Sequence, residues 1–499
     1  MFAIGIDSGT QGTKAIIVEA ASGKVLGRGT SPHAMIPGLK PGASEQDPTV
    51  WIEALEAALS EALKESKIDP AKVVSLGVSG QQHGFVPLGG DGRPLRPAKL
   101  WNDTSTVAET EHLVERLGGT KSYIEKLGIN LAVGFTASKI LWLKKNEPGH
   151  FKNLAKVLLP HDYLNYVLTG VARMEYGDAS GTGLMDIRNR RWHPEAVAAV
   201  DSSLDKALPE LAHSSLPLGY LRPDFGAKFG FKKVLVSSGG GDNMMGAIGT
   251  GNVAPGVCTL SLGTSGTIYS YFAAPFSDPA GEIAAFCDST GGWLPLLCTM
   301  NVTNTTELYK AFAGGLSNEE LERLAGEAPP GADGLIFLPF IDGERVPVLP
   351  NASAVFFGLN RSNFTQSHMA RAIMEGTILN LGYGFGRMKE LGLRPTEIRA
   401  TGGGAKSRLW LQIVADIFRT PVVTLQEREA AAFGAALQSI WSWRREQGDD
   451  VSIVDLAGTM VQKETDTAQP NSGRIGIYSE FQKRFNSLWI TLRSEFRIR

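Results

Sequence analysis

Two short segments rich in glycine and threonine are the first residues of this sequence whose types and spacing suggest chemistry. They read Gly9-Thr10-Gln11-Gly12-Thr13 and Gly263-Thr264-Ser265-Gly266-Thr267, so the pattern G-T-x-G-T recurs just past the middle of the chain. Glycine lets the main chain approach an anion closely, and successive backbone N–H groups with threonine hydroxyls can bind phosphate. The pair suggests two phosphate-binding turns, although each segment alone also fits a tight β-turn without a ligand.

An aspartate stands beside the first of these turns but not beside the second. Asp7 precedes the first glycine by two residues, and Ser261 occupies the matching position of the second copy. A carboxylate repels a nearby phosphate unless a cation lies between them, and Mg²⁺ is commonly held by one or two carboxylates, phosphate oxygens and water. Asp7 is therefore predicted to hold a metal ion through water.

A second aspartate, Asp242, follows the small residues 237–241 and precedes a helical pattern that starts at Asn243. Catalytic groups commonly lie at the carboxyl ends of strands in open α/β sheets. Aspartate is also a favoured helix N-cap, so a capping role is the alternative. The segments 81–83 and 101–104 read Gln-Gln-His and Trp-Asn-Asp-Thr, which supply the hydrogen-bonding groups and aromatic face of a sugar site, or ordinary structural contacts.

Strands and helices must position these residues. Apolar runs at 3–6 and 15–18 flank the first turn, runs at 257–262 and 268–271 flank the second, and each pair predicts a hairpin. Further strands are predicted at 73–78, 234–236 and 397–400, each entering a glycine-rich turn, and helical spacing predicts helices at 49–66, 367–381 and 407–418. Residues 462–474 resemble a surface segment before a last helix.

The alternation of strands and helices predicts an α/β fold built of two related halves with a mixed sheet in each. We place the halves at residues 1–250 and 251–499, and expect a cleft or hinge between them because no long linker separates them. Strand, glycine turn and helix form the repeated unit, so the sugar and phosphate candidates are expected at the ends of strands.

Composition and missing motifs exclude several function classes. The 49 basic and 51 acidic residues leave a net charge of −2 without a basic tract, so no nucleic acid partner is expected. Three cysteines without a Cys-x-x-Cys pair fit a reducing cytoplasm, and the N-terminus does not resemble a secretion signal. The charge-free stretch 243–277 is interrupted by polar residues and proline, so no membrane span is expected. P-loop, zinc protease and serine hydrolase motifs are missing.

Two longer patterns carry a resemblance to a known family. Residues 134–146 read GFTASKILWLKKN, and residues 354–375 start with AVFFGL, continue to His368-Met369 and end in AIME. In these patterns the sequence resembles the FGGY family of carbohydrate kinases, of the actin and hexokinase-like ATPase superfamily, over essentially its whole length. The resemblance implies two ribonuclease H-like domains and ATP-dependent phosphorylation of a sugar. Residues 80–84, 100–103, 159–164 and 178–182 are similar to members that phosphorylate D-xylulose to D-xylulose 5-phosphate.

The resemblance also implies roles for individual residues. Asp242 is the expected catalytic base, and Asp7 the expected catalytic and Mg²⁺-holding residue. The expected sugar-binding residues are Gln82, His83, Trp101, Asn102, Asp103 and Asn243. The expected ATP-binding residues are Gly9, Thr10, Gln11, Thr13, Lys14, Gly263, Thr264, Ser265, Gly402, Gly403, Gly404 and Lys406.

Alternatives to xylulose phosphorylation stay open at this point. One is another sugar or polyol kinase of the same fold that acts on ribulose, glycerol, gluconate or fuculose. The other is a nonenzymatic actin-like nucleotide switch or sugar sensor, which the presence of both Asp7 and Asp242 disfavours. The expected partners are ATP and a small sugar, with no membrane partner. The resemblance implies a homodimer, and the few cysteines imply a cytoplasmic location.

Overall fold

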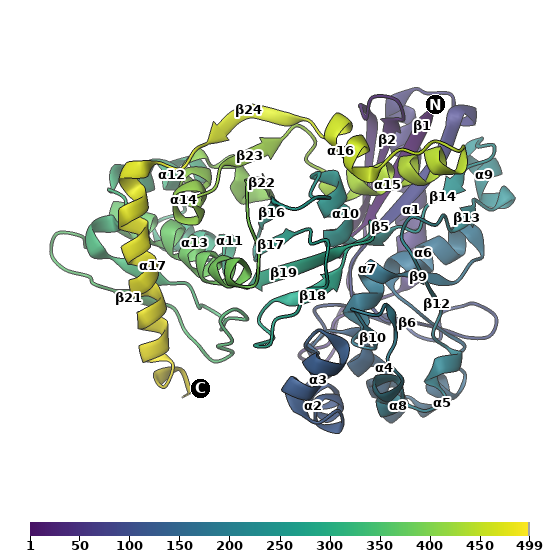
Figure 1. Cartoon of the computed structure of the whole chain (residues 1–499), viewed down its shortest axis with the longest axis horizontal. Coiled ribbons are helices and arrows are strands. Elements are labelled where there is room, and N and C mark those ends of the chain that lie inside the picture. Colours follow the sequence, from purple (N-terminus) through teal and green to yellow (C-terminus); the bar gives the residue numbers. More distant parts are fainter. Residues whose placement is uncertain (498–499) are drawn as a thin grey trace. The chain divides into compact units, whose positions relative to one another are not determined.

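The computed structural model describes residues 1–497, which pack as two compact units (Figure 1). Unit 1 consists of Met1–Ala254, Tyr271–Pro295 and Glu429–Val461. Unit 2 consists of Pro255–Ser270, Leu296–Arg428 and the chain from Gln462 onward. Packing thus places two segments of the later sequence in unit 1, and the division into residues 1–250 and 251–499 stays a prediction.

Unit 1 is built on a mixed sheet in the order β13 (Gly219–Tyr220), β14 (Leu235–Val236), β5 (Val73–Gly80), β1 (Phe2–Ser8), β2 (Gly12–Glu19) and β3 (Val25–Pro32). The short strand β15 (Gly240–Gly241) also pairs with β5. Strands β1 and β2 form the predicted antiparallel hairpin, and β5 runs parallel to β1. Ala3, Ile4 and Ile6 are fully buried, as expected for a strand covered on both faces.

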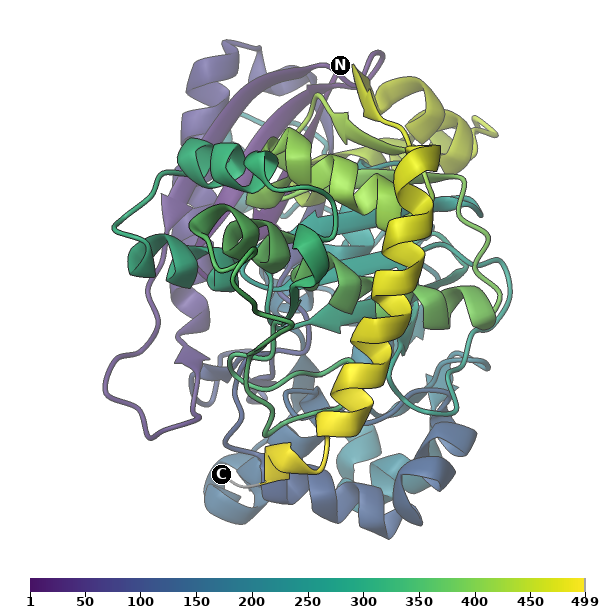
Figure 2. The same ribbon diagram turned by 90° about the vertical axis from the view of Figure 1, so that its left-hand side faces the viewer.

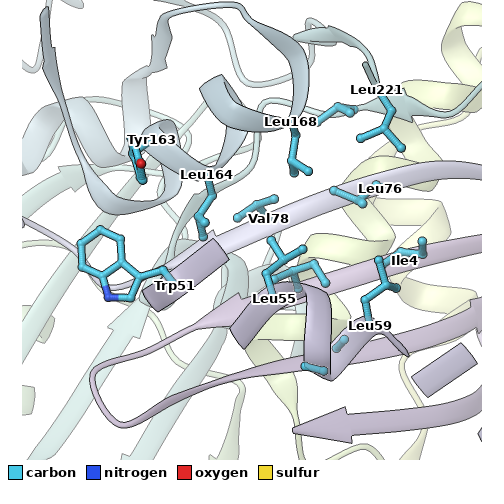
Figure 3. Packing of buried hydrophobic residues seen from close by; sticks show 14 of the residues in the cluster. Ile4, Trp51, Leu55, Leu59, Leu76, Val78, Tyr163, Leu164, Leu168 and Leu221 are labelled. Atoms are coloured by element: carbon cyan, nitrogen blue, oxygen red, sulfur yellow. The ribbon is translucent and has the colours of Figure 1, made fainter. Parts of the chain in front are cut away.

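Helices α1 (Pro48–Ser66) and α6 (Pro160–Thr169) contribute to one hydrophobic core with this sheet. Figure 3 shows Leu55 and Leu59 of α1 close to Ile4, Leu76 and Val78 of the strands, with Leu164 and Leu168 of α6 in the same cluster. Fully burying a side chain of this size contributes about 1.5–3 kcal/mol. This core fixes β1 and β5, whose ends carry the candidate residues.

Helix α15 (Ala430–Glu446) packs closely against the same sheet. A Cβ atom on Gly5 would lie 1.9 Å from the carbonyl oxygen of Ala432, and one on Gly77 would lie 2.1 Å from that of Ala435. Glycine in the two strands therefore lets the backbone of α15 approach the sheet directly. This contact explains why a late segment of the chain belongs to unit 1.

Unit 1 contains further elements outside this sheet. Its remaining helices are α2 (Val107–Arg116), α3 (Gly119–Leu127), α4 (Thr136–Asn146), α5 (Pro148–Lys152), α7 (Tyr176–Ala179), α8 (Pro194–Val200), α9 (Pro223–Phe229), α10 (Asp242–Gly249) and α16 (Ile453–Met460). Its remaining strands are β4 (Glu45–Gln46), β6 (Val86–Leu88), β7 (Ala98–Lys99), β8 (Lys156–Leu158), β9 (Arg173–Glu175), β10 (Met185–Asp186), β11 (Arg191–Trp192), β12 (Glu210–Ala212) and β18 (Ala284–Cys287).

Unit 2 repeats the central arrangement of unit 1. Strands β16 (Val257–Leu262) and β17 (Gly266–Ser270) form the second predicted hairpin, and β22 (Glu397–Thr401) runs parallel to β16 as β5 does to β1. Strand β19 (Trp293–Thr299) pairs antiparallel with β17 through residues 296–299, and β23 (Val422–Leu425) runs parallel to β22. The predicted α/β fold with related halves and mixed sheets is therefore confirmed.

Residues 462–474 lie at the surface before a last helix, as predicted, but part of the segment forms a strand that the prediction did not include. Lys463–Ala468 form β24, which pairs antiparallel with β23, and α17 (Ser472–Leu492) follows. None of the β24 side chains is buried, so the segment lacks the apolar residues by which a strand is recognised in sequence. A polar strand at the edge of a sheet pairs through its backbone alone on one side.

The helices of unit 2 are α11 (Thr303–Phe312), α12 (Asn318–Glu327), α13 (Gln366–Glu390), α14 (Arg408–Phe418) and α17, and a small sheet joins β20 (Ile336–Leu338) to β21 (Val355–Phe357). Helix α17, yellow in Figure 2, packs against α13 and α14. Glu375 of α13 accepts hydrogen bonds from Arg371 Nε (2.5 Å) and from the Tyr478 hydroxyl of α17 (2.7 Å). Within residues 1–497, no helix combines the length and apolarity that crossing a membrane requires.

Candidate active site

Strand register brings the two candidate carboxylates to one edge of the sheet in unit 1. Asp7 of β1 lies opposite Ser79 of β5, and Gly240 of β15 pairs with the same Ser79 from the other side. Asp242 follows β15 directly as the first residue of α10. All three strands are parallel, so Asp7 and Asp242 lie where their carboxyl ends meet, as the sequence predicts.

The surroundings of these carboxylates favour proton transfer. Burial raises the pKa of Asp242 to about 7, and the negative charge of Asp7 adds to the shift. Burial also raises the pKa of Asp7, although Ser79 Oγ donates to its Oδ1 at 2.8 Å and lowers that pKa. A carboxylate with a pKa near 7 can accept a proton from a hydroxyl at neutral pH.

Asp242 does not occupy the N-cap position that the alternative interpretation assigned to it, although it lies at the helix N-terminus. Gly241 occupies the N-cap position of α10, and Asp242 is the first residue inside the helix. Asp242 Oδ1 accepts the backbone N–H of Asn243 at 2.8 Å and its side-chain amide at 3.1 Å. A negative charge is favourable at a helix N-terminus. The helix therefore orients the carboxylate, and its other oxygen remains available for chemistry.

The residues present fit one kind of metal site. Among residues 1–497 no group of three or more His, Cys, Asp or Glu side chains could enclose a metal ion. Asp7 and Asp242 supply two partly buried carboxylates, one of which raises the pKa of the other. Mg²⁺ characteristically takes few protein carboxylates and completes its shell with phosphate oxygens and water. The pair fits a Mg²⁺ ion that arrives with a nucleotide.

Two of the predicted sugar ligands are joined to Asp242 by hydrogen bonds. Asn243 Nδ2 donates to Gln82 Oε1 at 2.8 Å as well as to Asp242. Gln82 Nε2 in turn donates to the sulfur of Met244 at 3.2 Å. The amides of Gln82 and Asn243 are thus held next to the carboxylate, where they can orient a substrate hydroxyl.

Trp101 and His83 are two further predicted sugar ligands. The Trp101 indole N–H donates to Thr10 Oγ1 at 2.9 Å, which links the predicted sugar segment to the first glycine turn. The side chain is 39% exposed, so its ring can meet a ligand. His83 follows Gln82 with a positive φ of 61°, which turns its side chain away from the regular strand path.

The structure places Asp103 differently from the other predicted sugar ligands. Its carboxylate is fully buried and accepts hydrogen bonds from Lys99 Nζ at 3.0 Å and from the Ser44 backbone at 2.9 Å. Burial acts to raise its pKa, but bonds from Ser105, Ser44 and Lys99 outweigh it and hold the pKa below its usual value. The neighbouring Asn102 is exposed and its side-chain oxygen accepts from Ser44 Oγ at 2.7 Å. These contacts favour a supporting role for Asp103.

The first glycine turn is braced by side chains from three other segments. Gly9 N–H donates to the Gly12 carbonyl at 3.0 Å and closes the turn, and Thr10 Oγ1 donates to Gln81 Oε1 at 3.2 Å. Gln46 Nε2 donates to the Thr10 carbonyl at 2.7 Å. Gln11 stays exposed, whereas the hydroxyl of buried Thr13 lies 3.0 Å from that of Ser8. The next residue, Lys14, pairs with Glu429 at 2.5 Å.

The second glycine turn lies beside the predicted adenosine motif within unit 2. Gly263 N–H donates to the Ser265 carbonyl at 3.0 Å, and the carbonyls of Gly263 and Thr264 accept from Thr303 (3.0 Å) and Val302 (3.1 Å) at the start of α11. Gly402 and Gly404 pack against Leu262, the residue before the turn, where a Cβ would lie 2.7 and 2.8 Å from its nearest atoms. Residues 402–406 are therefore neighbours of the second turn.

Three glycines of these loops have no internal reason to be glycine. A Cβ on Gly9 would lie 3.7 Å from the nearest atom, one on Gly263 would lie 3.5 Å away, and one on Gly403 would meet nothing within 4 Å. Their φ angles lie outside the left-handed region that favours glycine. A ligand that approaches the backbone explains glycine at these positions better than the fold does.

A buried charged cluster lies under the site, and sequence reasoning assigned it no role. His161 Nδ1 lies 2.7 Å from Asp178 Oδ2, and its Nε2 lies 3.1 Å from Asp162 Oδ1. Burial acts to lower the pKa of His161, but Asp162, Asp178 and Glu175 raise it to about 9, so an imidazolium is held among carboxylates. The charge of Asp178 also contributes to the raised pKa of Asp242. The sequence feature that could have indicated this cluster is the presence of charged residues within apolar segments.

Comparison with known proteins supports the fold described above. Residues 2–249 match the N-terminal domain of the FGGY family of carbohydrate kinases, and residues 277–443 match its C-terminal domain. The chain belongs to the FGGY family. As a carbohydrate kinase it transfers phosphate to an alcohol group, with ATP as the co-substrate that the family implies.

Individual relatives of this FGGY kinase share almost its whole length. A xylulose kinase of Haemophilus influenzae is 45% identical over 490 residues, which are 97% of this chain and 98% of the relative. The crystal structure of a xyloylose kinase from Brucella ovis matches with a TM-score of 0.92 and 30% identity, covering 99% of this chain and 100% of the other. A gluconate kinase from Lactobacillus acidophilus matches with a TM-score of 0.90 and 25% identity over 99% of each chain. The FGGY fold thus accommodates more than one sugar.

Proposed function

We propose that this FGGY kinase transfers the γ-phosphate of ATP to the terminal hydroxyl of D-xylulose and forms D-xylulose 5-phosphate. The observation that carries the proposal is the 45% identity with a xylulose kinase over nearly the full length of both chains. The arrangement of Asp242, Asn243 and Gln82 supports it, because a base lies beside two amides suited to sugar hydroxyls.

In the proposed mechanism, Asp242 accepts the proton of the attacking hydroxyl as the oxygen bonds to the γ-phosphorus and ADP leaves. The pKa of about 7 makes this carboxylate a stronger base than an exposed aspartate while leaving it partly ionised at neutral pH. Gln82, His83, Asn243 and Trp101 orient the sugar, and positioning supplies much of the rate enhancement in phosphoryl transfer. Asp7, oriented by Ser79, would hold Mg²⁺ through water, and the ion would offset the negative charge of the phosphates.

The proposed ATP contacts are those named from the sequence. In unit 1 they are the turn from Gly9 to Thr13 and Lys14, and in unit 2 they are Gly263, Thr264, Ser265, Gly402, Gly403, Gly404 and Lys406. The open space at Gly9, Gly263 and Gly403 supports these assignments, because the fold alone gives no reason for glycine there. Backbone N–H groups of such turns can donate to phosphate oxygens without a side chain in the way.

The test is ADP release by the purified protein with D-xylulose, ribulose, glycerol, gluconate and fuculose as acceptors. We expect the highest kcat/KM for D-xylulose, and phosphorus NMR of the product should place the phosphate on carbon 5. A higher kcat/KM for gluconate would instead favour the chemistry named for the Lactobacillus acidophilus structure. ATP hydrolysis that no acceptor stimulates would contradict the proposal altogether.

A homodimer and a cytoplasmic location complete the proposal. The homodimer comes from the family resemblance, and the cytoplasmic location from the few cysteines. Light scattering coupled to size exclusion, and fractionation of cells, test the two separately from the activity.

A further inference from the structure

The first family pattern of the sequence, residues 134–146, has no role in the mechanism described so far. In the structure its first residues lie around one predicted sugar ligand, His83. Phe135 precedes α4, and Thr136 and Lys139 lie in its first turns. All three contact His83, the ring through Phe135 and the backbone through the other two. The pattern therefore surrounds a site residue.

The backbone of His83 needs such support. Its φ of 61° lies in the left-handed region, which residues other than glycine adopt at an energetic cost. Glycines stand on either side at 80 and 84, yet the strained position itself carries a large side chain. Strained conformations at functional sites persist where the surrounding contacts determine them.

Two side chains of α4 hold the peptide group of His83. Lys139 Nζ donates to the His83 carbonyl at 2.7 Å, and Thr136 Oγ1 donates to the same oxygen at 3.2 Å. Lys139 Nζ also donates to the carbonyl of Gly134, at the start of the pattern. One amine thus ties the loop that contains His83 to the segment that carries Phe135.

The ring of His83 is fixed separately from its backbone. It packs against Phe135 with ring centroids 4.5 Å apart, and against Phe286 at 5.6 Å. On another side it lies against Gly181, where a Cβ would be only 2.3 Å from two ring atoms. Ring and backbone contacts together determine where the imidazole points.

The burial of Lys139 is unfavourable in free energy, and its contacts indicate the role of the side chain. The side chain is 0% exposed, and burial lowers its pKa to about 7, an effect that Asp103 opposes and Lys99 reinforces. Its hydrogen bonds go to two main-chain carbonyls. An amine donates to carbonyls in either protonation state, so the role suited to Lys139 is to hold backbone in place.

We propose that Lys139 and Thr136 are positioning residues that hold His83 in the conformation that binds the sugar, so that they set the affinity for the acceptor. The inference rests on the proposed function, because that function assigns His83 to the sugar. It gives the family pattern at residues 134–139 a physical role in substrate recognition.

The test compares Lys139→Met with Lys144→Met, a matched control on the same helix. Lys144 Nζ also donates to a carbonyl, that of Val200 at 2.9 Å, and pairs with Asp201 at 2.7 Å. Lys139→Met removes two hydrogen bonds to main-chain carbonyls, so we expect it to raise the KM for the acceptor about tenfold or more. The KM for ATP should stay within about twofold of that of the wild type, because Lys139 contacts only the His83 side of the site.

Thr136 gives a milder second test in case Lys139→Met fails to fold. Thr136→Val removes one donor to the His83 carbonyl and should raise the acceptor KM severalfold, whereas Thr136→Ser keeps the hydroxyl and should restore the wild-type value. Calorimetric binding of the acceptor without ATP should show the same order of affinities. A loss of thermal stability with unchanged acceptor KM in both variants would overturn the inference.

The outcomes separate this inference from the proposed function. If the wild-type enzyme prefers another acceptor, the proposed function fails, and the KM for that acceptor becomes the readout for Lys139 and Thr136. If the wild-type enzyme phosphorylates D-xylulose while the variants at both positions bind it normally, only the inference fails. If the wild-type protein binds no acceptor at all, both fail.

Discussion

The two G-T-x-G-T turns occupy the same place in their sheets but differ in strand register and in their surroundings. Each joins two antiparallel strands, each has a parallel strand beside its first strand, and in each the first glycine closes the turn with a 3.0 Å hydrogen bond. The first turn is held by side chains, from Gln46, Gln81 and Trp101. The second is held by backbone N–H groups at the start of α11, which donate to the carbonyls of Gly263 and Thr264.

The difference indicates how the two units divide the chemistry. Backbone donors are common to both turns, so both can serve phosphate, whereas the carboxylate at the first turn, Asp7, is replaced by Ser261 at the second. Asp242, Gln82 and Asn243 also belong to unit 1. We therefore expect acid–base chemistry to depend on unit 1, and substitutions at matched positions of the two turns to have unequal effects.

The largest effect is expected at Asp242. Asp242→Asn removes the proposed base but keeps a side chain of similar shape, so kcat should fall by roughly 10²- to 10⁴-fold, the usual effect of losing a general base. Sugar affinity, measured by calorimetry, should stay close to that of the wild type because the Gln82–Asn243 contact remains. A kcat within a few fold of the wild-type value would show that another group takes the proton.

The next effect compares Asp7 with its counterpart Ser261. Asp7→Asn should lower the rate and raise the Mg²⁺ concentration for half-maximal activity by about 10- to 100-fold, as expected for a group that holds a metal ion through water. Ser261→Ala, at the matched position, should leave the Mg²⁺ titration unchanged. Equal responses of the two variants would remove Asp7 from the metal site and cancel the proposed division of roles.

The sequence predicts the secondary structure around the two turns better than the long-range contacts. Both hairpins, the position of Asp242 after a strand and the helix at 49–66 depend on local patterns, and the structure contains them. The bonds of Asn243 to Gln82 and the approach of α15 to Gly5 join residues far apart in the chain, so no local pattern predicts them. Strand β24 was missed because its residues are polar.

A third, smaller effect tests the backbone contacts that the two turns should share. Gly9→Ala and Gly263→Ala add a methyl group where the protein has room, so the fold should tolerate both. A methyl group that meets a phosphate should raise the KM for ATP about tenfold, equivalent to about 1.4 kcal/mol of lost binding. The acceptor KM should change little in both variants.

The control for these variants is Gly386→Ala near the C-terminal end of α13, where a Cβ meets nothing within 4 Å. Alanine is the better helix former by about 1 kcal/mol, so this variant should be slightly more stable and bind ATP normally. If Gly9→Ala and Gly263→Ala bind ATP like Gly386→Ala, neither turn contacts the phosphates.

The smallest effect is a pH-dependent change in stability, which we expect for a substitution at Asp242 and not for one at Ser261. Because the folded-state pKa of Asp242 is raised from 3.8 to about 7, the folded protein holds this proton more tightly than the unfolded chain, and the free energy of unfolding falls as pH rises between those values. The Asp242→Asn variant has no carboxyl group to ionise at this position. Its stability advantage over the wild type should therefore be absent below pH 4, grow up to about pH 7 and then level off. Thermal unfolding with EDTA at several pH values measures it, and Ser261→Ala should show no such pH-dependent difference, since it removes no ionisable group. A constant offset for Asp242→Asn across pH would mean that its carboxyl group titrates normally in the folded protein.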